Sequence, residues 1–208
     1  AFRGGVALGP YLRKKFGIPV YINNDGDLFA YGEALGGALP EINEKLELAG
    51  SSKRYRNLLG YVFGDGFGVG MIVNEMLNRG DNSCVETCYF PHAKRPDIIV
   101  EEGVSIRAVK RVYKEISGDP RELEPKDIFE IAEGRLEGNR EAAVQAFAEM
   151  GELTGEVALP AANLVDGLVV LGGGMTGAAK YIKPSLLEVM RSKISTLDGK
   201  ELSRIPMK

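Results

Sequence analysis

The residues best suited to chemistry form three short motifs, and the first is Asn23-Asn24-Asp25, directly after a β-rich run at 20–22. In α/β proteins, ligands bind beyond the carboxyl ends of strands. There, the Asp25 carboxylate could accept a proton from an attacking hydroxyl, and the Asn24 carboxamide could both donate to and accept from a polyol. Asn and Asp are also favoured at helix N-caps, so a purely structural cap is the alternative interpretation.

The second motif places glycine at every second position from Gly64 to Gly70. A hairpin of this kind lets backbone N–H groups approach phosphates closely, because no Cβ intervenes. It is not a P-loop, since no Gly-Lys-Ser/Thr follows. The alternative is a tight hairpin whose glycines only turn the chain or face a close neighbour.

The third motif, Gly172-Gly173-Gly174, lies between an apolar run at 167–171 and a helical pattern. A flat surface without side chains fits a nucleotide base or ribose, and a helix N-terminus favours negative charge. A glycine turn between a strand and a helix is a weak signal by itself. Close packing of the helix on the sheet explains the glycines equally simply.

A fourth group, Cys84, Cys88 and His92, has four-residue spacing that suggests a zinc site. Structural zinc usually takes four protein ligands, often from C-x2-C pairs. Pro91 also argues against one helix that carries all three side chains. We therefore expect no bound zinc.

The bulk composition excludes little beyond nucleic-acid and membrane proteins. The chain has 208 residues, 44% of them hydrophobic and 26% charged, with a net charge of -3 and no basic run. Nucleic acid is therefore not expected as the main partner. No apolar stretch approaches the roughly 20 residues that span a bilayer, and two cysteines do not make a disulfide framework. We expect a cytoplasmic protein without membrane association.

Periodicity predicts the elements that must position these motifs. Apolar residues at i, i+4 and i+8 predict a helix over 8–16 that stops at Gly17. The remaining expectations are listed by range: strands at 20–22, 58–63, 71–73 and 167–171, helices at 28–39, 105–116, 125–134, 139–163 and 178–195, a tight turn at 74–75 and a helix end with a loop at 40–56. This order indicates a mixed α/β fold in which the strand at 167–171 is buried on both faces.

Together the motifs resemble the ROK family of sugar kinases. The run Ile18 to Asp25 resembles the family's strand that ends in "E/N-N-D", Gly64 to Gly80 its "G-T-G-x-G-G-G" hairpin, and Val169 to Gly174 its "V-V-L-G-G-G" motif. Any one motif is weak, but three in this order are a specific signal. The resemblance implies an actin-like (ribonuclease H-like) ATPase fold with a mixed sheet flanked by helices. Residues 1–40 would be a remnant of the N-terminal lobe, and 41–208 the C-terminal lobe.

The resemblance also implies an activity, the phosphorylation of a hexose by ATP with Mg²⁺, in a protein that is a homodimer when intact. Asp25 would be the catalytic base, and Asn24 and Glu86 would bind the sugar. The residues implied to bind ATP are Gly64, Asp65, Gly66, Gly68, Gly172, Gly173 and Gly174.

Some positions depart from the family pattern. The zinc-binding run "C-x-C-G-x-x-G-C" is absent, Tyr89 stands where the family has a sugar-binding histidine, and Asp65 replaces a threonine. An anionic side chain beside phosphates repels them unless Mg²⁺ intervenes. The family's opening "D-x-G-x-T" hairpin is also absent, so we expect the chain alone to be inactive. A ROK-type sugar-sensing transcriptional regulator and a degenerate, non-catalytic sugar-binding protein stay open as alternatives.

Overall fold

The computed structural model describes residues 5–206. Residues 1–4 and 207–208, the outer ends of the two expected lobes, lie outside this range. The elements in chain order are α1 (Leu8–Phe16), α2 (Asp25–Gly36), α3 (Ala38–Leu48), β1 (Leu58–Phe63), β2 (Phe67–Val73), β3 (Met76–Asn78), β4 (Pro91–His92), β5 (Arg95–Ile99), η1 (Val100–Glu102), α4 (Ile106–Ser117), α5 (Pro125–Ala132), α6 (Arg140–Val165), β6 (Leu168–Gly172), η2 (Gly174–Ala178), α7 (Ala179–Met190), β7 (Lys193–Ser195) and β8 (Glu201–Ser203).

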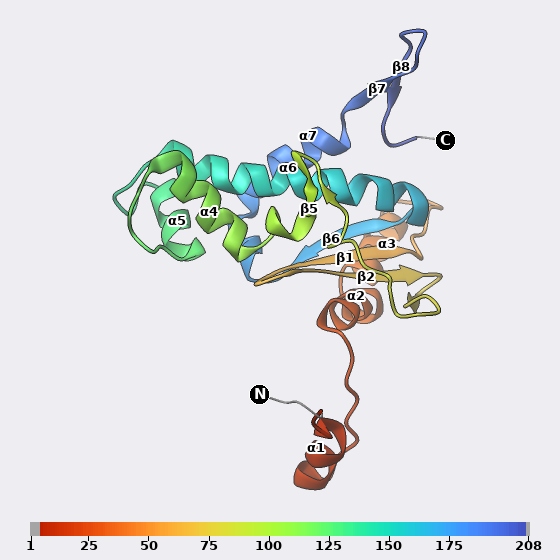
Figure 1. Ribbon diagram of the computed structural model, residues 1–208. Coiled ribbons are helices and arrows are strands. Elements are labelled where there is room, and N and C mark those ends of the chain that lie inside the picture. The colour runs from red at the N-terminus through yellow and green to blue at the C-terminus, as the bar shows by residue number, and fades with distance from the viewer. Residues whose placement is uncertain (1–4, 207–208) are drawn as a thin grey trace.

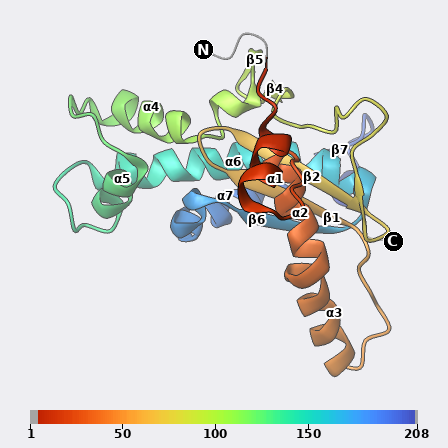
Figure 2. The ribbon, with the colours of Figure 1, turned by 90° about the horizontal axis from the view of Figure 1, so that it is seen from below.

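The centre of the molecule is a mixed sheet in the order β3-β2-β1-β6. β1 and β2 form an antiparallel hairpin that closes at the Phe63–Phe67 pair, whereas β6 runs parallel to β1. The long helix α6 covers one face of the sheet and α2 covers the other (Figure 1). Viewed from below, α2 lies in front of the sheet, α6 and α7 lie behind it, and α3 extends away from it to one side (Figure 2).

Alternation along the strands divides the core into two clusters. Leu59, Tyr61 and Phe63 of β1 pack in the large cluster with α4, α5, α6 and α7, while Leu58 packs with Ala30 of α2 in the small one. This follows from strand geometry, because successive side chains point to opposite faces. The sheet is therefore buried between two helical layers.

The packing of α2 on the hairpin is unusually close. A Cβ atom at Gly70 would lie 2.4 Å from the carbonyl oxygen of Gly26 and 2.5 Å from Cβ of Ala30. Glycine at position 70 therefore allows the first turns of α2 to lie directly on β2. This contact places the start of α2 beside the glycine hairpin.

Several local predictions are confirmed. The first helix spans Leu8–Phe16 and stops at Gly17, which has the left-handed conformation typical of a helix C-terminus. The turn at Asn74 and Glu75 has positive φ at both residues, as a type I′ hairpin turn requires. The strand expected at 71–73 begins earlier, at Phe67, so the second half of the glycine run belongs to β2 and only residues 64–66 form the turn. The remaining helices and central strands begin and end within a few residues of their expected limits, apart from the differences described next.

The prediction of a strand at 20–22 is wrong. These residues have no regular structure, and the side chain of Tyr21 is 91% exposed. The β-branched sequence alone does not form a strand, because a strand requires a hydrogen-bonding neighbour, and none lies beside this segment within residues 5–206. The Asn23-Asn24-Asp25 motif consequently follows an extended segment instead of a strand.

The segment 40–56 does contain a helix end and a loop, but its helical part belongs to a separate helix, α3, that was not expected. Leu39, Ile42 and Leu46 recur at helical spacing under the charged surface, a signal that the overall polarity of the segment hides. The remaining loop is fastened to α3 by Asn43, whose side chain donates to and accepts from the backbone of Tyr55.

Two expectations at the C-terminal side also need correction. β6 contacts both core clusters, but its side chains are mostly only half-buried, because it forms an edge of the central sheet in the described part of the chain. The last expected helix ends at Met190 instead of 195, and Lys193–Ser195 form a strand paired with Glu201–Ser203.

The helix α1 stands apart from the rest of the molecule and is joined to α2 by the extended segment 17–24 (Figure 1). The division of the chain into two lobes near residue 40 stays a prediction. Within residues 5–206, no helix is both long and apolar enough to cross a membrane.

Candidate ligand site

Asn24 and Asp25 begin α2, and the two side chains differ in what they do locally. Asn24 is the N-cap, since its Oδ1 accepts the backbone N–H of Asp27 at 3.1 Å. The structural interpretation of Asn24 is therefore confirmed. Asp25 lies in the first turn, where its Oδ1 accepts only the neighbouring N–H of Gly26 at 3.0 Å. The capping interaction does not use the Asp25 carboxylate, which stays available for a ligand.

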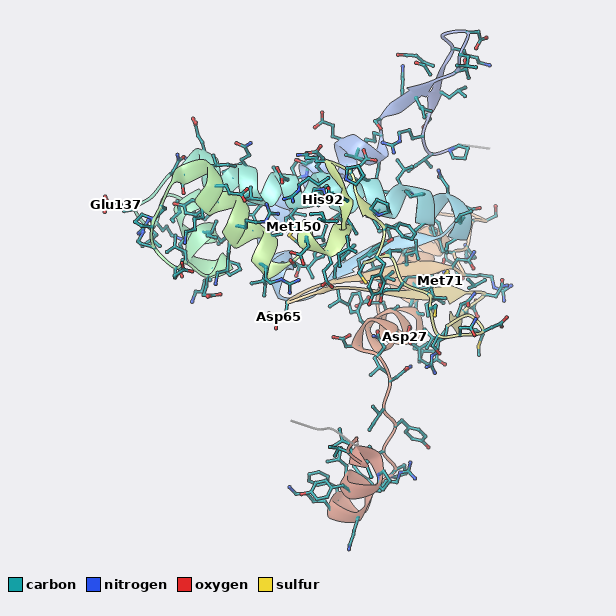
Figure 3. The ribbon with its side chains drawn as sticks, viewed as in Figure 1. Asp27, Asp65, Met71, His92, Glu137 and Met150 are labelled. Atoms are coloured by element: carbon teal, nitrogen blue, oxygen red, sulfur yellow. The ribbon has the colours of Figure 1, made fainter. Side chains whose placement is uncertain are left out.

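One cavity of about 350 Å³ brings the first two motifs together, and we call it the hairpin cavity. Asn24, Asp25 and Glu86 line it with the glycine turn. All seven of the expected site residues outside the third motif contribute to its wall: Asn24, Asp25, Gly64, Asp65, Gly66, Gly68 and Glu86. Figure 3 shows Asp65 at the tip of the β1–β2 hairpin, at one end of the sheet.

A larger cavity of about 610 Å³ adjoins the hairpin cavity, with Asn24 and Glu86 in both walls. We call it the Arg79 cavity. Its polar wall includes an ion pair between Arg79 Nε and Asp27 Oδ2, 3.5 Å apart. Asp27 is nearly buried on the α2 side of the sheet (Figure 3). Tyr89, at the position of the family's histidine, also lines this cavity.

The electrostatics of the shared wall depend on Glu86. Burial raises the pKa of its carboxyl group, and the N–H groups of Thr87 and Cys88, which donate to Oε1, oppose that rise. The negative charge of Asp27 raises the pKa of Glu86 further. A proton donor such as a sugar hydroxyl would relieve part of this unfavourable burial of charge.

Cys88 and Glu101 also line the hairpin cavity, and the sequence motifs assigned neither of them to this site. Burial first, then the charges of Glu86 and Glu101, raises the pKa of the Cys88 thiol to about 11, so it is protonated at neutral pH. Glu101 Oε2 accepts the N–H of Phe67 at 3.1 Å. No sequence motif indicates Glu101, because 34 residues separate it from its partner.

The side chains of the candidate zinc ligands do not point to a common position: they are Cys84, Cys88 and His92. Cys84 is exposed, Cys88 is buried, and the buried His92 uses Nδ1 to accept the N–H of Lys94. Within residues 5–206, no group of three or more His, Cys, Asp or Glu side chains could hold a metal ion. The expectation that no zinc binds stays a prediction.

The glycines of the two motifs serve different purposes. A Cβ at Gly64 would meet open space, whereas one at Gly66 would lie 2.8 Å from Glu101 Oε2. In the third motif, a Cβ at Gly172 would strike the Phe29 ring at 2.3 Å, and Gly173, with φ of 89°, packs on the backbone of Phe63. Both therefore have a packing role, and their contact with a nucleotide stays a prediction.

Gly174 is the open glycine of the third motif, and it lines a cavity of about 290 Å³. Phe129, Phe147 and Met175 give this cavity an apolar wall, and Lys126 lies at it. We call it the Gly174 cavity. An apolar wall with aromatic rings fits a flat heterocycle.

The mixed sheet with helices on both faces has the arrangement of an actin-like ATPase fold. Residues 5–204 match the model of the ROK family, and the chain belongs to this family. The family resemblance and the fold class expected from the motifs are therefore both confirmed.

Solved structures and a curated relative extend this result. A glucokinase from Parabacteroides distasonis ATCC 8503 is 59% identical with a TM-score of 0.85, over 91% of this chain and 54% of that chain. A ROK family glucokinase from Streptomyces griseus, in complex with glucose and AMPPNP, is 20% identical with a TM-score of 0.67, over 88% of this chain and 61% of that one. A xylose repressor from Bacillus spizizenii (strain ATCC 23059 / NRRL B-14472 / W23) is 31% identical over 75 residues, 36% of this chain and 16% of the repressor.

The chain thus spans about half the length of the Parabacteroides glucokinase. Sugar kinases and repressors both occur among the similar proteins, so family membership alone does not decide between an enzyme and a regulator.

Proposed function

We propose that the full-length protein is a hexose kinase that transfers the γ-phosphoryl group of ATP to a sugar hydroxyl. The observation that carries the proposal is the hairpin cavity, where a free carboxylate, Asp25, faces a glycine turn with an open surface at Gly64. Phosphoryl transfer needs a group to orient the attacking hydroxyl and donors to bind phosphate oxygens. The cavity offers both within one space.

In this proposal, Asp25 accepts the proton of the attacking hydroxyl. Glu86 accepts a hydrogen bond from another sugar hydroxyl, and the Asn24 carboxamide donates to a further one. The sugar would occupy the side of the hairpin cavity that borders the Arg79 cavity, since Asn24 and Glu86 line both.

ATP fits the residues present at the other side of the site. Among the described residues, no hydrogen bond uses the backbone N–H of Asp65 or Gly66, so both can donate to phosphate oxygens. The adenine would lie in the Gly174 cavity, against Phe129 and Met175. Gly64, Gly66 and Gly68 would keep side chains out of the space of the phosphates.

Among residues 5–206 no three carboxylates converge on a metal, so Mg²⁺ would enter with ATP, held by phosphate oxygens, water and one carboxylate of the cavity wall such as that of Asp65. When bound, the ion would neutralise phosphate charge that the Asp65 carboxylate otherwise repels. Without such an ion, the Asp65 carboxylate would weaken the binding of phosphate groups at the turn.

A sugar-sensing regulator is the second candidate, and the similarity to a xylose repressor favours it. A sensor needs sugar ligands but neither a base at Asp25 nor free donors at the hairpin. A non-catalytic sugar-binding protein is the third candidate, and Tyr89 and Asp65 favour it. A coupled assay of ATP consumption by the full-length protein with glucose and fructose separates these. Sugar binding without turnover would contradict the kinase proposal.

A further inference from the structure

The glycine turn at the tip of the β1–β2 hairpin is held from outside by the start of α4. The N–H of Ile106 donates to the carbonyl oxygen of Gly64 at 3.0 Å. Arg107 Nη1 donates to the carbonyl oxygen of Asp65 at 2.9 Å. Two consecutive peptide units of the turn are therefore attached to α4 through their oxygens.

These contacts determine where the N–H groups of the turn point. In a planar trans peptide, C=O and N–H point in opposite directions. The N–H of Asp65 shares a peptide unit with the Gly64 carbonyl, and the N–H of Gly66 shares one with the Asp65 carbonyl. Both donors therefore point away from α4, and they are the same two that no hydrogen bond uses. Successive free N–H groups of this kind bind anions.

Arg107 also connects the turn to the carboxylate wall of the hairpin cavity. Its Nη2 donates to Glu101 Oε1 at 3.3 Å, while Glu101 Oε2 accepts the N–H of Phe67 at 3.1 Å. The backbone N–H of Glu101 in turn donates to the carbonyl of Cys88, in the loop that carries Glu86. One guanidinium thus joins the turn on one side to the loop of Glu86 on the other.

We propose that Arg107 is a positioning residue that orients the Asp65–Gly66 peptide so that its N–H binds a phosphate of ATP. This inference rests on the proposed kinase function. The planar fork of arginine suits the task, because it holds two acceptors in a fixed relative geometry that lysine cannot reproduce.

A role in stability alone explains Arg107 poorly. Its side chain is 55% exposed, and its carboxylate partners are Glu101 and the half-exposed Glu102. Exposed ion pairs contribute little to folding. The hydrogen bond from Arg107 to the carbonyl oxygen of Asp65 is the contact that matters for the site, because it fixes the orientation of the Asp65–Gly66 peptide.

The test compares Arg107→Met with Arg111→Met in the full-length protein. Arg111 lies one turn further along α4, where it pairs with Glu115 and the carbonyl of Glu102 and has no hydrogen bond to the turn. We expect Arg107→Met to raise KM for ATP about tenfold, the effect of one lost charge-assisted hydrogen bond, with KM for glucose changed less than about twofold. Arg111→Met should leave both constants unchanged, and Arg107→Lys should recover part of the loss.

Hydrogen exchange supplies a readout without ligand. The amides of Gly64 and Phe67 donate to the carbonyl of Gly66 and to Glu101 Oε2, and both should exchange faster in Arg107→Met and at the original rate in Arg111→Met. Both variants should melt near the temperature of the unaltered protein. Equal exchange in the two variants, or an unchanged KM for ATP in Arg107→Met, would overturn the inference.

Failure of the proposed function is a separate outcome. If the unaltered protein phosphorylates no hexose, the kinase proposal fails, and calorimetric titration with ATP then tests Arg107 directly. If the affinity for ATP falls about tenfold in Arg107→Met and stays unchanged in Arg111→Met, the positioning role is still supported. No binding of ATP, or equal binding by both variants, overturns it.

Discussion

The substitution Asp25→Asn tests the proposed chemistry most directly. It preserves the size of the side chain and its ability to accept the N–H of Gly26, and it removes the capacity to accept a proton. The helix cap is unaffected, because Asn24 provides it. Any loss of activity therefore reports on the carboxylate.

The expected magnitudes are far apart. Loss of a general base lowers turnover by about 100- to 10,000-fold, equivalent to roughly 3–5 kcal/mol of transition-state stabilisation. Loss of one negative charge in the first turn of a helix costs only about 0.3–1 kcal/mol of folding stability. In a chain of this size, that lowers the melting temperature by about 1–4 °C. An effect on folding cannot imitate the loss of the base.

The assay is coupled ATP consumption by the full-length protein with glucose and with fructose, together with sugar affinity by calorimetry. The control is Asp127→Asn, since Asp127 is also a first-turn aspartate, in α5, and accepts the N–H of Glu124 outside the three cavities. We expect kcat to fall only in Asp25→Asn, with sugar binding nearly intact. Turnover by Asp25→Asn equal to that of the unaltered protein would refute the catalytic role.

Three further predictions concern packing, charge and assembly. Gly70→Ala should lower the free energy of unfolding by about 1–3 kcal/mol in denaturant titrations, because its Cβ would collide with the carbonyl of Gly26 and with Ala30; an unchanged midpoint would refute the close packing of α2. Burial and Asp27 raise the pKa of Glu86, so the folded state keeps a proton that the unfolded chain loses, and stability falls as pH rises from the unfolded pKa through the folded one. Glu86→Gln should flatten that fall in thermal melts between pH 4 and pH 8, roughly the range in which a carboxyl with a raised pKa titrates, and an equal slope in both proteins would contradict it. From the family resemblance, the full-length protein should be a homodimer, and a monomer mass in light scattering at micromolar concentration would contradict this.

The sequence alone was sufficient to predict the local features, which depend on interactions between residues close together in the chain. The helix over Leu8–Phe16, the turn at Asn74 and Glu75, and the hairpin around the glycine run follow from periodicity and turn chemistry, which act over a few residues. The order of the motifs was sufficient for the family and the fold class. The grouping of Asp25 with the hairpin also agrees with that expectation.

Only the tertiary structure decided what each residue of these motifs contacts. The run at 20–22 has strand-forming residues but no neighbouring strand among residues 5–206, and the close packing of α2 and of Phe29 requires glycine at positions 70 and 172. Glu101 and Arg107 belong to no motif, yet they hold the turn at Asp65. The physical reason is that sequence patterns report local conformation, whereas contacts between distant segments depend on strand register and on how closely helices pack.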